Sequence, residues 1–243
     1  MHFTPEQIFI VTGATSGIGR GVALLINKLG GSVVAIGRNN EKLELLRQEA
    51  SLPASIFMEC CDLEARADTL TKYVGQLKDK YGKFQGLVCC AGMGNIMPLR
   101  AVDLSLLYKI FLINHHVPIL LARGFADKRN HTEHRPSVVF LASIAALHGT
   151  PGLTAYAGSK GALIASAQAM AKELAPAGIR VNCVSPSLID TPMVSETARE
   201  FAKGKYPFGI GSVDDVAQMV IFLLSARSQW ITGQNYVIDC GSL

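Results

Sequence analysis

The sequence predicts an α/β fold of the doubly wound type, with a seven-stranded parallel sheet covered by helices on both faces. Three observations predict it. Short runs of apolar and β-branched residues alternate with segments of helical periodicity along the whole chain. A glycine-rich turn separates the first apolar run from the first helical segment. Of the 243 residues, 49% are hydrophobic and only 17% are charged, as expected for strands buried on both faces.

Each expected element follows from its local sequence. The strands are short apolar runs that end at small or polar residues, and they cover residues 8–12, 32–36, 55–60, 86–90, 138–142, 179–184 and 236–239. The helices have apolar residues three or four apart, and they cover residues 22–26, 41–48, 63–81, 103–126, 156–174 and 213–225. No long linker or repeat interrupts this alternation, so residues 1–243 are expected to form a single domain. The polar segment 195–205 is expected to form a helix within a small substrate lid at about 190–210.

Charge and hydropathy argue against two classes of protein. The net charge is only +4, and the basic residues are scattered apart from Lys128, Arg129 and Arg135, which share a polar loop with acidic residues. This pattern is typical of a solvated turn, so no nucleic-acid partner is expected. No apolar run approaches the ~20 residues that span a bilayer, and the N-terminus lacks the regions of a secretory signal. We therefore expect a cytoplasmic protein with no membrane partner.

The cysteines and histidines do not predict a metal site or a disulfide framework. The six cysteines show no Cys-x-x-Cys pattern, and five lie in or beside strand-like runs, which favours buried, reduced thiols. His131 and His134 lie with a glutamate in a loop, but no further ligands are evident nearby. His115 and His116 are expected to be packing or lid residues, and no metal is expected.

The glycine-rich turn spans residues 13–19, with glycines at Gly13, Gly17 and Gly19. A strand precedes the turn and a helix follows it, which is the context in which such a turn binds phosphate. Glycines let backbone N–H groups approach a pyrophosphate, and the helix N-terminus adds a partial positive charge. The sequence therefore predicts a dinucleotide cofactor at this turn.

The end of the second strand indicates which dinucleotide is bound. An acidic residue about 20 residues past the glycines would hold the ribose 2′-hydroxyl of NAD, but Arg38 and Asn39 occupy this region. A guanidinium binds a 2′-phosphate with paired hydrogen bonds, so NADP(H) is favoured over NAD(H). The alternative is an exposed arginine that ends a strand. Asp62, at the end of the third strand, is expected to meet the adenine edge, to cap the next helix, or both.

Three polar side chains in the segment 143–160 predict acid–base chemistry. Tyr156 and Lys160 are four residues apart, which places them on one face of a helix. A nearby ammonium favours the phenolate by up to ~4 kcal/mol at an effective dielectric constant of ~20, so we expect a lowered pKa for the tyrosine. Ser143 follows a strand and could donate a hydrogen bond to the oxygen being protonated. The alternative is a solvated helix face, and the choice depends on the rest of the chain.

Asn114 lies inside the expected helix 103–126, four residues before Pro118. Because proline has no N–H, the main-chain carbonyl of Asn114 loses its helical partner. A bound water is the natural replacement partner. A kink tolerated for packing alone is the alternative.

In their order and spacing, these features resemble the short-chain dehydrogenase/reductase family over essentially the whole chain. The matching features are Thr12-Gly13-x3-Gly17-x-Gly19, Asp62-Leu63, Ala91-Gly92, Asn114, Ser143, Tyr156-x3-Lys160, Pro186, Ile189-x-Thr191, Asp214-Asp215-Val216-Ala217 and Ile231-Thr232-Gly233-Gln234. The last two are similar to the subgroup of 3-oxoacyl carrier-protein reductases. The resemblance implies a Rossmann-type domain that binds a nicotinamide dinucleotide.

The resemblance also implies roles for individual residues. Tyr156 would be the general acid or base, and Ser143 would orient and polarise the carbonyl. Lys160 would bind the nicotinamide ribose and lower the tyrosine pKa, and Asn114 would hold a water through its main chain. Ile189 and Thr191 would bind the carboxamide. The residues expected to contact the cofactor are Gly13, Thr15, Ser16, Gly17, Ile18, Gly19, Arg38, Asn39, Asp62, Leu63, Ala91, Gly92, Tyr156, Lys160, Pro186, Ile189 and Thr191.

Three positions depart from the family pattern. Cys89-Cys90 replaces the usual pair of asparagines, Ser187 replaces a glycine, and Ile210 replaces an arginine common in the carrier-protein reductases. None of these positions belongs to the expected catalytic set of Asn114, Ser143, Tyr156 and Lys160. The departures concern cofactor contacts and the choice of substrate.

The sequence as a whole predicts an NADP(H)-dependent carbonyl reductase or alcohol dehydrogenase. A catalytically inactive NADP(H)-binding sensor is the alternative from another class, and a glycine-loop methyltransferase is a third. The substrate is expected to be a small carbonyl or alcohol compound, in a mainly apolar site suggested by Leu147, His148, Met193 and Phe208. The resemblance further implies a homo-oligomer, a homotetramer or a dimer.

Overall fold

A computed structural model of the chain describes residues 1–192, 194, 196–202 and 206–242. Within these residues a single sheet of seven strands runs in the order β3-β2-β1-β4-β5-β6-β7, and every neighbouring pair is parallel. The strands are β1 (Ile8–Thr12), β2 (Ser32–Gly37), β3 (Ile56–Cys60), β4 (Phe84–Cys89), β5 (Ser137–Leu141), β6 (Arg180–Pro186) and β7 (Asn235–Ile238). The predicted doubly wound fold is confirmed.

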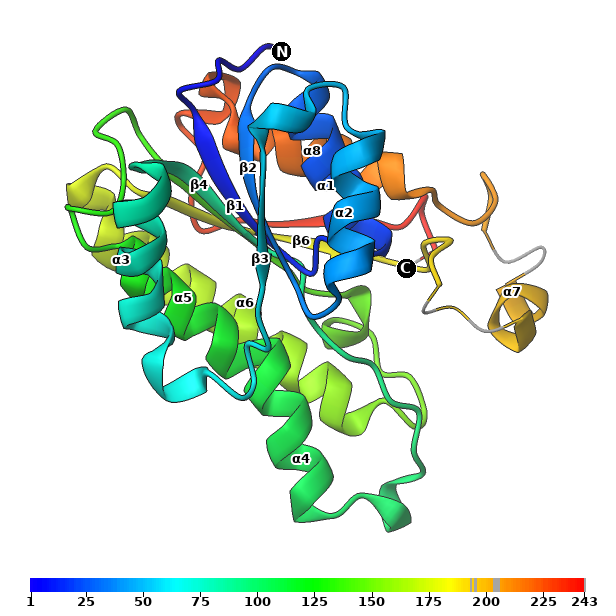
Figure 1. The fold of residues 1–243 in the computed structure, drawn as a ribbon. Coiled ribbons are helices and arrows are strands. Elements are labelled where there is room, and N and C mark those ends of the chain that lie inside the picture. Colours follow the sequence, from blue (N-terminus) through cyan, green and yellow to red (C-terminus); the bar gives the residue numbers. More distant parts are fainter. Residues whose placement is uncertain (193, 195, 203–205, 243) are drawn as a thin grey trace.

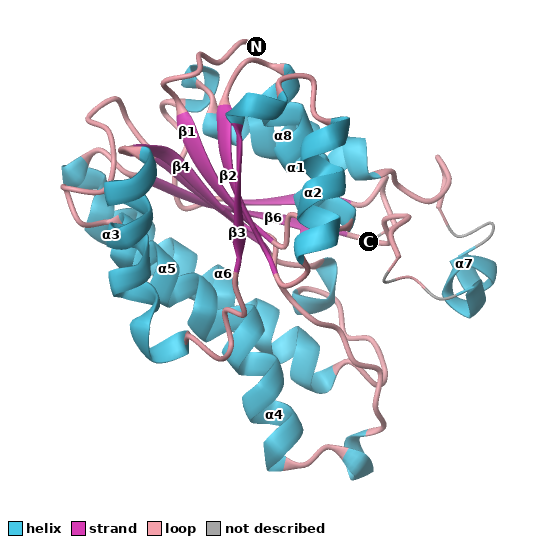
Figure 2. Ribbon diagram, viewed as in Figure 1, coloured by secondary structure: helices cyan, strands magenta, loops and turns pink. Residues whose placement is uncertain are grey.

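Helices cover both faces of the sheet (Figures 1 and 2). They are α1 (Gly17–Lys28), α2 (Asn40–Glu49), α3 (Leu70–Tyr81), α4 (Leu104–Phe111), α5 (Val117–Phe125), α6 (Thr154–Leu174), α7 (Glu196–Ala202) and α8 (Val213–Leu224), with a π-helical turn, η4 (Leu112–His116), between α4 and α5. Short 3-10 turns are η1 (Pro53–Ser55), η2 (Ala67–Thr69), η3 (Leu99–Ala101), η5 (Ile144–Ala146), η6 (Ala175–Ala177) and η7 (Ala226–Ser228).

The core consists of two apolar layers, one on each face of the sheet. Helices α3, α5 and α6 pack on one face, where Ile10, Leu87 and Phe140 point toward them. Helices α1, α2 and α8 pack on the other face, against Phe9 and Val11. Because successive strand residues point to opposite faces and both faces are covered, the central strands are apolar throughout. This explains the continuous apolar runs in the sequence.

The strand order reverses between β1 and β4, which lie side by side although β2 and β3 separate them in the sequence. Chain segments leave the carboxyl ends of these two strands in opposite directions, and a crevice opens between them. In open parallel sheets, ligands bind at such a switch point. The glycine turn after β1 and the turn after β4 therefore lie on the same groove.

The helix expected at 63–81 begins only at Leu70, so this boundary was wrong. The Asp62 carboxylate accepts hydrogen bonds from the backbone N–H groups of Glu64 and Ala65 at 2.9 and 3.2 Å. Aspartate side chains stabilise turns in this way and compete with a helix. Asp62 thus caps a turn after β3, and the helix starts later.

The helix expected at 103–126 is interrupted by the π-helical turn η4. Asp103 caps its start by accepting a hydrogen bond from the backbone N–H of Leu106. At its centre the N–H of Val117 bonds to the carbonyl of Leu112, five residues back. A π-turn of this kind inserts an extra residue and is frequent at functional sites. The disturbance of the helix expected from Pro118 takes the form of this π-turn, which contains Asn114.

The segment Leu104–Phe125 is, among the described residues, the one helical stretch long and apolar enough to cross a membrane by length and composition, with a mean hydropathy of 1.4. The sequence expectation had no segment of this kind. A single stretch is weak grounds for a membrane span, because core helices pass the same test. Here α5 packs against α3, and α4 packs against α6.

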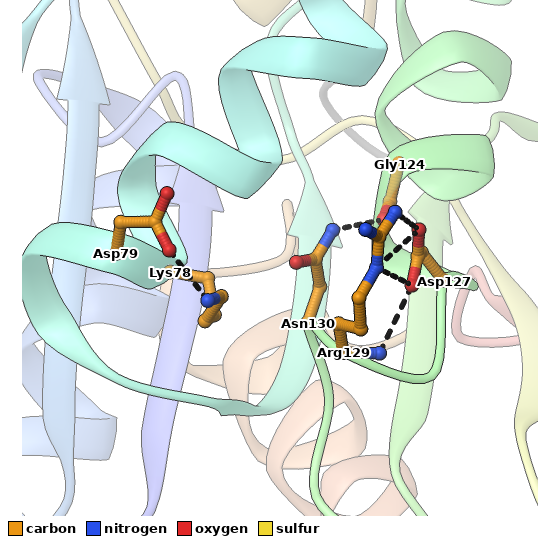
Figure 3. Close-up of polar contacts among 6 residues, drawn as sticks. All are labelled: Lys78, Asp79, Gly124, Asp127, Arg129 and Asn130. Atoms are coloured by element: carbon orange, nitrogen blue, oxygen red, sulfur yellow. Dashed lines mark hydrogen bonds and ion pairs between the residues drawn. The ribbon is translucent and has the colours of Figure 1, made fainter.

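The loop between α5 and β5 contains the small basic cluster and two histidines. Figure 3 shows Arg129 facing Asp127, with its Nε 2.9 Å from Oδ1, while the Asn130 side chain donates to the Gly124 carbonyl at 2.8 Å. The Arg129 guanidinium holds the pKa of the Asp127 carboxyl well below its usual range. His131 is buried and bonds to the Thr132 carbonyl. The exposed ion pair of Arg129 with Asp127 matches the solvated turn expected from the sequence, whereas Asn130 and His131 are buried.

Candidate active site

A groove of about 680 Å³ follows the carboxyl ends of the strands. It is lined by the glycine turn, by the ends of β2, β3 and β4, and by Ser143, Tyr156 and Lys160. Every residue expected to contact the cofactor lines this groove except Asn39. The Asn39 side chain instead accepts a hydrogen bond from the Lys42 N–H and caps α2. The expected contact of Asn39 with the cofactor stays a prediction.

The glycine turn is compact enough to exclude side chains. Gly13 and Gly17 have φ angles of +66° and +51°, which favour glycine. A Cβ at Gly19 would lie 2.4 Å from the Gly13 carbonyl oxygen. The Thr12 hydroxyl accepts hydrogen bonds from the N–H groups of Cys90 and Ala91, both at 3.1 Å, and so joins the turns after β1 and β4.

The start of α1 suits an anionic ligand. Ser16 occupies the N-cap without a side-chain hydrogen bond, and the first turn contains no acidic residue. The first N–H groups of a helix lack internal partners, and the helix dipole favours negative charge there. Because these groups border the groove, the residues present fit the pyrophosphate of a dinucleotide.

Arg38 and Glu64 form an ion pair in the groove near the ends of β2 and β3. The Arg38 side chain is 71% exposed, and its Nη1 lies 3.6 Å from Oε1 of Glu64, whose side chain is 23% exposed. Arg38 was expected here from the sequence, whereas Glu64 was not. The missed signal was the register of β2 and β3, which pairs Gly37 with Cys60 and brings the next turn beside Arg38.

Tyr156 and Lys160 lie one turn apart on α6, as expected. The Lys160 Nζ lies 5.9 Å from the centre of the Tyr156 ring. Ser143 comes from the end of β5 and makes a side-chain hydrogen bond to Tyr156. The Ser143 hydroxyl also accepts a hydrogen bond from the Ala145 N–H at 3.2 Å, which fixes its side chain. The fold thus brings the three residues of the segment 143–160 to one wall of the groove.

The expected lowering of the Tyr156 pKa was wrong for this structure. Burial raises the pKa of the phenol above 10.0, and the hydrogen bond from Ser143 only partly opposes this effect. Desolvation penalises the charged form of a buried acid. The ammonium of Lys160 is turned toward a backbone carbonyl, and the phenol therefore stays protonated at neutral pH.

Lys160 is buried, with an exposed fraction of 5%. Its Nζ donates a 2.7 Å hydrogen bond to the Leu141 carbonyl at the end of β5. Burial lowers the pKa of the ammonium to about 8, and the thiols of Cys90, Cys183 and Cys89 partly oppose this effect. Among the described residues no Asp or Glu raises the pKa of Lys160 again, so the lysine is close to the change between its two protonation states near neutral pH.

Asn114 is fully buried and joins three segments, although it does not itself line the groove. Its Oδ1 accepts from the Met93 N–H at 2.9 Å, and its Nδ2 donates to the Met93 carbonyl and to the Ser159 hydroxyl. Ser159 in turn donates to the Tyr156 carbonyl at 2.7 Å. Asn114 therefore ties the loop after β4 to the first turn of α6.

Gly92 lies between the two polar groups of this wall. A Cβ on Gly92 would lie 2.8 Å from Oδ1 of Asn114 and 3.5 Å from Nζ of Lys160. Only a glycine leaves room for the present positions of both side chains. The glycine of the Ala91-Gly92 motif is therefore required for steric reasons, in addition to its position in the groove.

The apolar lining of the groove differs from the expectation. Phe208 is 86% exposed and Leu147 is 46% exposed, and neither of them nor His148 lines the groove. Met193 lies outside the described residues. The apolar lining comes instead from Met93, Ile96, Ile113, Leu153, Leu188, Ile189, Pro192 and Val194. The rule that segments following strand carboxyl ends line the crevice could have found most of them.

The cysteines are all free, as expected, but they are not all buried. Cys61, Cys89 and Cys183 are buried, Cys90 and Cys240 are half-buried, and Cys60 is exposed. Cys90 lines the groove, and burial raises the pKa of its thiol to about 12. Among the described residues, no group of three or more His, Cys, Asp or Glu side chains is placed to hold a metal ion.

The departure at Ser187 is accommodated by the segment that follows β6. The Ser187 hydroxyl lies 3.0 Å from the Tyr206 hydroxyl, and the Ser187 N–H donates to the Ile238 carbonyl. Arg199 of α7 donates to Asp190 at 2.8 Å. Of the expected lid helix at 195–205, residues 196–202 form α7, whereas 195 and 203–205 lie outside the described residues.

An open parallel sheet with a glycine turn at its switch point defines a dinucleotide-binding α/β protein. A family model described as Enoyl-(Acyl carrier protein) reductase matches residues 13–242. The 3-oxoacyl-(acyl-carrier-protein) reductase of Thermotoga maritima is 34% identical over 244 residues, which cover 97% of each chain. The chain belongs to the short-chain dehydrogenase/reductase family and is similar to its 3-oxoacyl-(acyl-carrier-protein) reductases. It is therefore an oxidoreductase, and its family uses a nicotinamide cofactor.

Further relatives differ in the substrates that their names give. L-xylulose reductase of Caenorhabditis elegans is 30% identical over 246 residues, covering 98% of this chain and 96% of the relative. A short-chain type dehydrogenase/reductase from Mycobacterium ulcerans superposes with a TM-score of 0.89 at 32% identity, covering 100% of this chain and 91% of the other. 4-Hydroxyisoleucine dehydrogenase complexed with NADH superposes with a TM-score of 0.84 at 27% identity, covering 97% and 98%.

Proposed function

We propose that the protein is an NADP(H)-dependent oxidoreductase that interconverts a ketone and a secondary alcohol, with Tyr156 as general acid and base. The observation that carries the proposal is the wall formed by Ser143, Tyr156 and Lys160 in the same groove as the glycine turn. When bound, the nicotinamide supplies or accepts the hydride. A nucleotide sensor is not favoured, because binding alone gives no physical reason for this wall.

In the proposed mechanism the phenol of Tyr156 delivers the proton to the carbonyl oxygen. Burial keeps the phenol protonated, which suits the acid in the direction of ketone reduction. The Ser143 hydroxyl lies within hydrogen-bonding distance of the same phenol and would donate to the substrate oxygen that the phenol protonates. In the direction of alcohol oxidation, the oxygen of Tyr156 would accept the proton that leaves the alcohol hydroxyl.

Lys160 would replenish the proton of Tyr156. Within the described part of the chain its ammonium has one hydrogen bond, to the Leu141 carbonyl, so it keeps further donors for a ribose hydroxyl and for the proton path. A pKa of about 8 permits it to give and take a proton near neutral pH. The main-chain carbonyl of Asn114, which lies at the π-turn, would hold the water that connects Lys160 with solvent.

The choice of NADP(H) rests on Arg38. No carboxylate stands at the end of β2, and the exposed Arg38 lines the groove. A guanidinium is a fitting partner for a 2′-phosphate. Asp62, Leu63, Pro186, Ile189 and Thr191 would complete the seat of the dinucleotide, and all five line the groove.

A substitution of Tyr156 by phenylalanine tests the proposal. Tyr156→Phe removes the proton donor and little volume, so turnover of a ketone panel with NADPH should fall by about 10²- to 10⁴-fold. The dissociation constant for NADPH, followed by its fluorescence, should change by less than about twofold. Tyr108→Phe, on the exposed face of α4, is the matched control and should keep full turnover. Turnover that survives in Tyr156→Phe would mean that another acid acts.

Two further features of the protein are proposals. The segment at about 190–210 would act as a lid, which is supported by the ion pair between Arg199 and Asp190 beside the groove. The single domain would assemble into a homotetramer or dimer, which is supported by the exposed apolar side chains of Leu104 on α4 and Leu99 just before it. Sedimentation velocity at micromolar protein concentration would test the assembly, and a purely monomeric species would contradict it.

A further inference from the structure

Glu64 is a charged residue of the groove that the proposed function leaves without a role. It lines the groove beside Arg38, and its Oε1 lies 3.6 Å from the guanidinium. In the sequence the two residues are 26 positions apart, and only the pairing of β2 with β3 brings them together. The part of the groove that would hold a 2′-phosphate therefore contains a carboxylate as well as a guanidinium.

The backbone of Glu64 is held in place, and its side chain is less exposed than that of Arg38. The backbone N–H of Glu64 donates to the Asp62 carboxylate at 2.9 Å, and the N–H of Cys61 donates to the Gly37 carbonyl at 2.8 Å. These bonds fix the turn after β3 against the end of β2. The Glu64 side chain is 23% exposed, whereas that of Arg38 is 71% exposed. Arg38 can therefore turn toward a ligand while Glu64 stays close to it.

We propose that Glu64 sets the cofactor preference by opposing the 2′-phosphate. This inference rests on the proposed function, in which Arg38 binds that phosphate. A phosphate that pairs with Arg38 displaces part of the Arg38–Glu64 ion pair and comes close to a second negative charge, which repels it. NADH carries a neutral hydroxyl at this position and meets no such repulsion. Glu64 thus lowers the ratio of the affinity for NADPH to the affinity for NADH, and the protein can still bind NADH.

The test is the isosteric substitution Glu64→Gln, with dissociation constants for NADPH and NADH measured by cofactor fluorescence at low ionic strength. The affinity for NADPH should rise about two- to fivefold, the scale of a solvent-exposed ion pair. The affinity for NADH should stay within about 1.5-fold. The gain should shrink in 0.5 M salt, because exposed charges are screened.

Glu133→Gln is the matched control for the loss of one negative charge. Glu133 is exposed in the loop before β5, at the amino ends of the strands and away from the groove. This substitution should leave both affinities unchanged. An equal gain of NADPH affinity in Glu133→Gln would show an effect of net charge alone and would overturn the proposal.

Arg38→Met separates a failure of this inference from a failure of the proposed function. If Arg38→Met leaves NADPH affinity unchanged, the 2′-phosphate site itself is wrongly assigned. If Arg38→Met weakens NADPH selectively but Glu64→Gln does not tighten it, only the role of Glu64 is refuted. A weaker affinity in Glu64→Gln would show that Glu64 positions Arg38 instead. In the double variant, the gain from Glu64→Gln should be smaller than in the wild type, because displacement of the ion pair no longer contributes.

Discussion

The two ends of the groove hold their polar groups in different ways. At the buried end, around Asn114, Tyr156 and Lys160, the Asn114 amide and the Lys160 ammonium are enclosed and have hydrogen-bond partners within 3.0 Å. At the exposed end, Arg38 and Glu64 form one ion pair of 3.6 Å that faces solvent. Hydrogen bonds hold the side chains of the proposed catalytic site in place at the buried end, whereas the charges of Arg38 and Glu64 at the exposed end can pair with other groups.

This difference has a physical reason. A buried polar group is costly without a partner, so every donor and acceptor at the buried end constrains its neighbours. An exposed ion pair contributes at most about 1 kcal/mol, and its members can turn toward a ligand. Substitutions at the buried end should therefore damage the site as a unit, whereas substitutions at the exposed end should change selectivity alone.

Gly92→Ala should have the largest effect of the substitutions that test this comparison. The new Cβ would lie 2.8 Å from Oδ1 of Asn114, and the buried wall must shift to accept it. We expect a loss of about 1–3 kcal/mol in the free energy of unfolding, as for overpacked cores, and a fall in turnover of at least about tenfold. Urea denaturation and steady-state kinetics measure the two effects.

Gly161→Ala is the control for this substitution, because a Cβ at Gly161 meets no atom within 4 Å. An alanine in a helix should stabilise the chain by up to about 1 kcal/mol. Equal behaviour of the two variants would show that the buried wall is looser than its hydrogen bonds indicate.

The second prediction concerns the pH dependence that Lys160 gives to stability. Burial lowers the pKa of Lys160 from 10.5 to about 8 in the folded chain. Between these pH values the unfolded chain binds the proton and the folded chain does not, so the free energy of unfolding rises with pH. Relative to Lys160→Met, the wild type should gain up to about 3 kcal/mol from pH 8 to 10.5.

Urea denaturation of both proteins at several pH values measures this difference. The thiols of Cys90 and Cys183, each with a pKa raised by desolvation to about 12, lower stability as pH rises above 9, but both proteins contain them. Comparison with Lys160→Met therefore isolates the lysine. Parallel pH profiles of the two proteins would contradict a buried ammonium.

The smallest effect on the fold and the clearest effect on selectivity should come from Arg38→Asp. A carboxylate at the end of β2 repels a 2′-phosphate and accepts a hydrogen bond from a 2′-hydroxyl. The ratio of kcat/KM for NADPH to that for NADH should fall by at least about tenfold, with stability unchanged within about 0.5 kcal/mol. An unchanged ratio would place the 2′-phosphate elsewhere.

Much of the fold could be predicted because periodicity is a local property. β1 was predicted at its observed bounds, and the other strands agree to within two residues at either end. The helix bounds were less accurate where side chains compete with the backbone, as at Asp62, or where a π-turn interrupts the ladder, as at Asn114. The local sequence shows that a proline disturbs the helix but does not show how the backbone re-forms around it.

For the site, the sequence alone determined the candidate residues: the glycine turn, Arg38, and the spacing of Tyr156 and Lys160 follow from residue types and short separations. The tertiary structure decided how their charges behave. It enclosed Lys160 among thiols, raised the pKa of Tyr156 and placed Glu64 beside Arg38. Desolvation and contacts between distant segments produce these effects, and both depend on which elements pack together, which no single stretch of sequence encodes.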